Sequence, residues 1–94
     1  MDIQRTLAQI GERLTKARDD LRIVEEQLVF QQDVLEEAET RMLVSETPLA
    51  DREHRIARDD YERLARQRAE AQRLIDELQA EQDGLLDRML GANR

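Results

Sequence analysis

Apolar residues recur along the first half of the chain in alternating steps of three and four. Leu or Met occupies every seventh position from Leu7 to Met42, and a second row, mostly apolar, runs from Ile3 to Ala38. This spacing is typical of a coiled-coil seam, with Leu at the a positions and branched or small residues at d. Because two apolar positions in seven give only a narrow stripe, we expect another helix to cover it.

One break interrupts the pattern, at Ser45-Glu46-Thr47-Pro48. Pro disfavours helical backbone at the preceding residue and suits the first position of a new helix, for which Thr47 is a good cap. Beyond the break, seam rows resume from His54 to Met89 and from Ala57 to Leu85. The prediction is one domain, residues 1–94: a helix over 3–44, a turn over 45–47, a helix over 48–90 that Gly91 ends, and a frayed tail over 91–94.

Two helices of similar length joined by a short turn predict an all-α fold, an antiparallel two-helix coiled-coil hairpin. A single helix kinked at Pro48 is the alternative, because Pro also bends long helices. In a hairpin, facing seam residues have numbers with a constant sum, and sums of 92 and 99 both fit the rows. We prefer 92, which allows a tight turn and places Arg41 beside Glu53, whereas 99 places Arg68 opposite Gln31.

The first helix carries more apolar residues than one seam uses. The surplus residues, at b, c and g positions, are Ile23, Val29, Phe30, Val34, Leu43 and Val44. Scattered surface apolar residues are one interpretation. In a chain with one Phe and one Tyr, their concentration in half of one helix favours a second buried face instead. We expect two hairpins to pair through this face into a four-helix assembly, as a homodimer, and the face to be available to a protein partner.

Three polar residues occupy seam positions: Gln31, Arg68 and Gln82. Polar seam residues in coiled coils fix register or oligomer state at some loss of stability, and we assign them that role.

Composition excludes several classes of partner. Charged residues make up 39% of the chain, with 22 acidic against 15 basic and a net charge of -7, and Arg is interleaved with Asp and Glu. Nucleic acid and anionic membranes require clustered basic residues, so neither is expected as a direct partner. There is no Cys and no apolar run of the ~20 residues that span a membrane. We expect a cytoplasmic protein, and the use of Arg at every basic position but Lys16 favours a bacterial origin.

Catalytic and metal-binding patterns are missing from the sequence. His54 is its one histidine, and adjacent carboxylates such as Asp19-Asp20 point about 100° apart on a helix, so they do not share a pocket. No phosphate-binding loop or nucleophile motif occurs. We therefore expect no enzymatic activity, catalytic residue, cofactor, metal or small-molecule substrate.

Glu46, Asp51 and Glu53 surround the break and give the predicted hairpin an acidic tip. In this plan the chain resembles transcription regulators of the Gre and DksA types, and the resemblance implies a regulator that inserts carboxylates into RNA polymerase. The length and helix-turn-helix plan also resemble the WXG family of small secreted hairpins, which implies an exported helical dimer, although the chain contains no Trp. Our first hypothesis remains a non-enzymatic scaffold, adaptor or regulatory protein that acts through protein–protein contacts.

Overall fold

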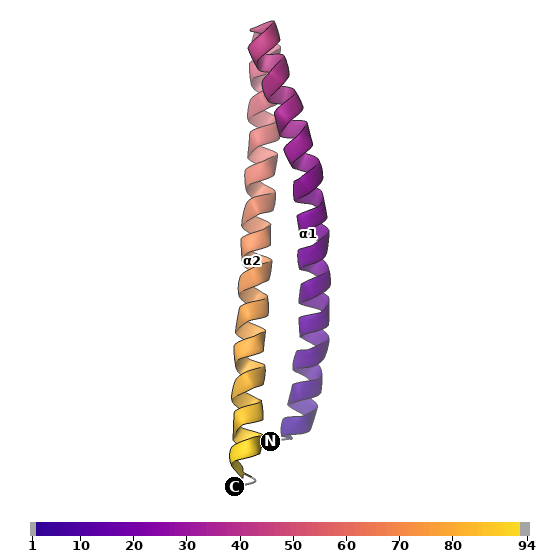
Figure 1. Ribbon diagram of the computed structural model, residues 1–94, viewed down its shortest axis with the longest axis vertical. Coiled ribbons are helices and arrows are strands. Elements are labelled where there is room, and N and C mark those ends of the chain that lie inside the picture. The colour runs from indigo at the N-terminus through magenta and orange to yellow at the C-terminus, as the bar shows by residue number, and fades with distance from the viewer. Residues whose placement is uncertain (1, 93–94) are drawn as a thin grey trace. The chain divides into compact units, whose positions relative to one another are not determined.

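The computed structural model describes residues 2–92 and contains two α-helices in that range, α1 (Ile3–Ser45) and α2 (Pro48–Ala92) (Figure 1). The chain divides into two compact units, and each helix contributes one half to each unit. Unit 1 combines Met1–Leu21 with Glu70–Arg94, and unit 2 is the continuous segment Arg22–Ala69, which contains the turn. The predicted all-α fold is confirmed.

Both helices begin at a capping side chain. The Asp2 carboxylate accepts a hydrogen bond from the Arg5 backbone N–H at 3.1 Å. The Thr47 hydroxyl accepts one from the Ala50 N–H at 3.2 Å, and Pro48 is the first residue of α2. These oxygens satisfy backbone donors that a helix start leaves without an intrahelical partner. The predicted cap at Thr47 is confirmed, whereas the cap at Asp2 was not predicted.

The turn between the helices depends on one residue in an unusual conformation. Glu46 has a φ of 48°, in the left-handed region. Its N–H donates to the Met42 carbonyl at 3.1 Å, which satisfies one of the free carbonyls at the end of α1. This is the single-bond αL termination of a helix, a position that Gly usually occupies. The chain therefore reverses over Glu46 and Thr47 alone.

The predicted end of α2 at residue 90 is wrong, because the helix continues through Gly91 to Ala92. Gly91 does not have a positive φ, so it does not form the left-handed termination that the prediction assumed. Glycine without that conformation is a weak helix former and not a stop. The rest of the predicted frayed tail, residues 93–94, lies outside the described residues.

Large aliphatic side chains form the core of unit 1. Its buried cluster consists of Ile10, Leu14 and Ala17 from α1 with Ile75, Leu78 and Leu85 from α2. Ile3, Leu7 and Leu21 pack against this cluster and are half-buried. Both helices contribute to the cluster, as the predicted seam requires.

Unit 2 has a smaller core. Its buried side chains are Ala38, Ala50 and Ala57. Leu28, Leu35 and Leu64 occupy seam positions there but are only half-buried. Small side chains allow closely spaced helix axes and remove little apolar surface from water. The apolar stabilisation of unit 2 is therefore weaker than that of unit 1.

Contacts across unit 2 show an antiparallel hairpin. Arg41 pairs with Glu53, with 3.5 Å between Nε and a carboxylate oxygen, and Arg68 pairs with Glu25 at 3.7 Å. Along one continuous helix, residues 41 and 53 would lie about 18 Å apart, so the kinked-helix alternative is excluded. The register with a sum of 92 places Arg41 beside Glu53, and this pair is observed. The register with a sum of 99 places Arg68 opposite Gln31, but Arg68 pairs with Glu25 instead.

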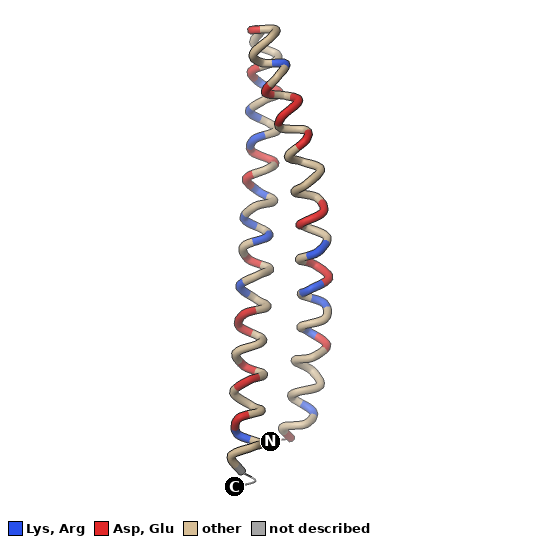
Figure 2. The backbone as a smooth tube through the Cα atoms, viewed as in Figure 1, with Lys and Arg blue, Asp and Glu red and all other residues tan. Residues whose placement is uncertain are grey.

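Charge is distributed differently along the two helices within unit 2 (Figure 2). The α1 segment, residues 22–45, contains six acidic and two basic residues, whereas the α2 segment, residues 48–69, contains five acidic and six basic. Within residues 2–92, neither helix is both long and apolar enough to cross a membrane.

Candidate protein-binding face

Five large apolar side chains project into solvent from one side of unit 2. On α1, Ile23, Phe30 and Val44 are spaced by seven or fourteen residues, and on α2, Leu49 and Ile56 are spaced by seven. Seven residues are close to two full helical turns, so each set forms one row along its helix. We call these five residues the apolar face.

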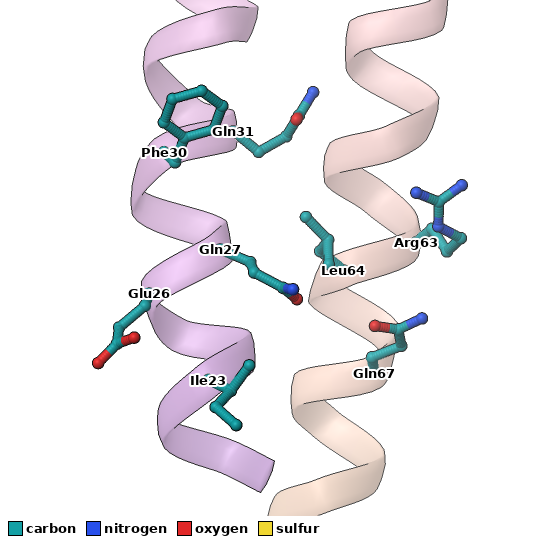
Figure 3. Close-up of a pocket in the computed structure, with 8 residues that line it drawn as sticks. All are labelled: Ile23, Glu26, Gln27, Phe30, Gln31, Arg63, Leu64 and Gln67. Atoms are coloured by element: carbon teal, nitrogen blue, oxygen red, sulfur yellow. The ribbon is translucent and has the colours of Figure 1, made fainter.

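A groove between the helices shows that the two rows lie on the same side. Its lining includes Ile23 and Phe30 from the α1 row and Arg63 from α2 (Figure 3). Arg63 lies seven residues after Ile56, so it continues the row that Leu49 and Ile56 begin. Both rows therefore border the groove side of unit 2.

The residues of the apolar face are exposed to an unusual degree for their size. Phe30 is 70% exposed, Val44 79% and Leu49 64%, and Ile23 and Ile56 are about half exposed. Single exposed apolar residues are ordinary on protein surfaces, but a set that shares one side of a small unit is typical of an interaction site.

The groove has a volume of about 710 Å³ and a mixed lining. Ile23, Phe30 and Leu64 supply apolar surface, and Gln27, Gln31 and Gln67 supply amides. Figure 3 shows Gln27, Gln31 and Leu64 directed into the space between the helices, whereas Glu26 and Arg63 point to opposite outer flanks. An amide both donates and accepts hydrogen bonds, so this lining suits a polypeptide surface with mixed side chains.

The structure brings together only part of the surplus apolar set predicted on α1. Val34 lies one turn after Phe30 and is half-buried beside the seam. Val29 and Leu43, 69% and 68% exposed, lie away from the apolar face. Consecutive helical residues point about 100° apart, and Val29 lies one turn after Glu25, whose ion pair with Arg68 marks the opposite side of the hairpin.

Leu49 and Ile56 are the members of the face that were not predicted from the sequence. Their seven-residue spacing outside the α2 seam rows was the available signal. Only the turn geometry, which sets the two helices side by side, shows that their row borders the same groove as Phe30.

The three residues of the predicted acidic tip have different surroundings. Glu53 is half-buried and held by Arg41, whereas Glu46 and Asp51 are exposed at the end of α1 and the start of α2. Among the residues that the structure describes, no group of three or more His, Cys, Asp or Glu side chains could hold a metal ion.

The three polar seam residues have different surroundings. Gln31 is half-buried and its amide donates to the Ala57 carbonyl of α2 at 3.1 Å. That carbonyl points along α2 toward Tyr61, the residue that faces Gln31 in the register whose facing residue numbers sum to 92. Arg68 is exposed in its ion pair with Glu25, and Gln82 is half-buried in unit 1. The Gln31 contact joins the two helices at one level, and the register-setting role of the three residues remains a prediction.

No protein-family model, curated protein or solved structure matches this chain. What the protein does is therefore inferred from its own residues.

Proposed function

We propose that the chain is a cytoplasmic, non-enzymatic scaffold or adaptor that acts through protein–protein contacts made by the apolar face. The observation that supports this function is the exposure of five large apolar side chains on one side of unit 2. Exposed apolar surface is unfavourable in water and favours association that removes it. The proposed partners are proteins, because the face is apolar and has neither the clustered basic residues that bind nucleic acid nor a group of metal ligands.

Phe30 is the proposed anchor of this surface. It is the one Phe of the chain, is 70% exposed, and borders the groove. Aromatic residues at the centre of an interface commonly dominate its binding energy, and truncating such an anchor typically costs ~2 kcal/mol or more.

The experiment compares Phe30→Asp with Val29→Asp. The two residues are adjacent on α1 and almost equally exposed, so each substitution adds one charge to the same turn of helix. We expect Phe30→Asp to lower partner recovery at least tenfold in quantitative affinity purification from the producing cells, and Val29→Asp to preserve it. Circular dichroism of both variants checks that the helices remain folded.

Alanine at Glu46, Asp51 and Glu53 provides the competing test in the same experiment. Under the proposal these substitutions preserve partner binding, because none of the three residues belongs to the apolar face. If the triple variant lost binding while Phe30→Asp retained it, the acidic-tip regulator would replace the scaffold as the better hypothesis.

A further inference from the structure

We infer that a second copy of this chain covers the apolar face, and that the two-fold axis of the dimer runs along the helices. In this arrangement α1 of each copy lies on α2 of the other, and both turns are at the same end. The inference rests on the proposed function and deepens it by naming the partner and its orientation. Its basis is confined to unit 2.

The charges of the two helices distinguish between the possible two-fold arrangements. If the axis crossed the helices, α1 would lie on α1 of the second copy, and both segments carry six acidic residues against two basic (Figure 2). If the axis runs along the helices, this acidic segment lies on α2, where basic residues slightly outnumber acidic ones. Like charges across an interface disfavour a pairing and opposite charges favour it. The lengthwise axis is therefore preferred.

The apolar residues on α1 also lie at the same heights along the hairpin as suitable contact residues on α2. The cross-helix ion pairs join residues whose numbers sum to 94 and 93. By the same sum, Val44 is level with Leu49, and Phe30 is level with Arg63. A lengthwise axis keeps these levels, so Val44 of one copy meets Leu49 of the other, and Phe30 meets a guanidinium. Apolar contact and cation–π attraction are both favourable there.

Glu26 and Arg63 make the groove self-complementary. They lie on its opposite flanks, and rotation about the lengthwise axis brings Glu26 of each copy to the flank that carries Arg63 of the other, one helical turn from the level of Arg63 and within reach of its long side chain. An isologous interface requires this property, since every contact occurs twice with the roles exchanged. Within one hairpin Glu26 pairs with Arg22 and Arg63 with Asp60, both on exposed surface. Such pairs are weak, so their rearrangement is easy.

The dimensions of unit 2 suit a stable dimer. Two helices of about 22 residues each are roughly 33 Å long, and two side by side are about 20 Å wide. One side thus offers on the order of 700 Å², close to the ~800 Å² that each partner contributes to a standard interface.

Cysteine cross-linking tests the arrangement, because the chain contains no Cys of its own. Val44→Cys and Leu49→Cys are made in separate chains with different tags, mixed in denaturant, refolded together and oxidised. Separate chains exclude a bond within one hairpin. We expect the mixed disulfide to form at least fivefold faster than in a mixture of Leu43→Cys with Leu49→Cys, in which Leu43 is also well exposed but lies away from the face.

Two results would overturn the inference. Faster cross-linking of Val44→Cys with Ile23→Cys than with Leu49→Cys would indicate an axis that crosses the helices. A monomer by light scattering at micromolar concentration would exclude the second copy altogether. In that case the proposed function would still stand if Phe30→Asp, unlike Val29→Asp, lost a different protein partner.

Discussion

At the residue scale, Glu46 has an unfavourable backbone conformation. A left-handed conformation costs roughly 1–2 kcal/mol for a residue with a Cβ, and Glu46 adopts it at φ 48°. Glycine has no such penalty but loses more conformational freedom on folding. We expect Glu46→Gly to raise the free energy of unfolding by about 0.5–1 kcal/mol in urea denaturation at fixed chain concentration. Glu46→Ala is the control, because it removes the carboxylate and keeps the Cβ; an equal gain there would assign the effect to charge.

The residues around the turn show what a sequence predicts at this scale. Thr47 and Pro48 have strong local preferences, so the cap and the first residue of α2 could be read from their chemistry. The left-handed Glu46 could not, because Glu has no preference for that region and the geometry comes from closing the hairpin over two residues. Asp2 was identifiable in principle, as an acid directly before the first seam residue.

At the scale of the elements, packing is uneven although the apolar pattern is nearly continuous. Unit 1 buries leucine and isoleucine, whereas the buried side chains of unit 2 are alanines and its seam leucines are half exposed. The sequence predicted which residues line the seam. It did not predict how deeply each is buried, because burial depends on the local spacing of the helices and on polar residues such as Gln31 that lie between them.

This difference predicts unequal responses to the same substitution. Leu14 is 2% exposed in unit 1, and Leu14→Ala is expected to lower the free energy of unfolding by about 2–5 kcal/mol, since it leaves a cavity among buried side chains. Leu28→Ala in unit 2 removes an already half-exposed side chain, and less than half that loss is expected. Denaturant titrations at one chain concentration measure both, because dimerisation adds to apparent stability. A larger loss for Leu28→Ala would show that its half-exposed surface is covered elsewhere, as in the proposed dimer.

Only the α1 part of the apolar face was predicted from the sequence. The surplus apolar residues on α1 were visible as residues that one seam does not use, and Ile23, Phe30 and Val44 do share a side. Periodicity alone did not separate these three residues from Val29 and Leu43. The groove lies on the side set by how α2 packs beside α1, and the spacing along α1 does not show which side that is. Leu49 and Ile56 join the face only through that neighbour.

For the whole molecule, charge and apolar surface have separate roles in the proposed dimer. The apolar face supplies most of the attraction, because exposed ion pairs contribute only a few tenths of a kcal/mol each. The acidic character of α1 and the more basic character of α2 in unit 2 instead select which helices meet. Orientation is therefore expected to respond to charge reversal more than affinity does.

Charge reversal at the groove tests the pairing of Glu26 with Arg63 between the two copies of the proposed dimer. Glu26→Arg alone places a second guanidinium against Arg63 twice per dimer, and Arg63→Glu alone places a second carboxylate against Glu26 twice. Loss of two attractions of about 0.3–0.5 kcal/mol each weakens a homodimer by up to roughly fivefold, and two repulsions of similar size bring the expected weakening to about 8- to 30-fold. In a mixture of the two variants, the heterodimer joins the introduced guanidinium at position 26 to the introduced carboxylate at position 63. Its other pairing is the native one of Glu26 with Arg63, so both pairings are attractive again. We expect sedimentation at low salt to show preferential heterodimers.

A mixture of Glu25→Arg with Arg63→Glu is the control, since Glu25 lies on the opposite side beside Arg68 and should give no such preference. Equal preference in both mixtures would mean that net charge, and not the pairing of Glu26 with Arg63, governs association.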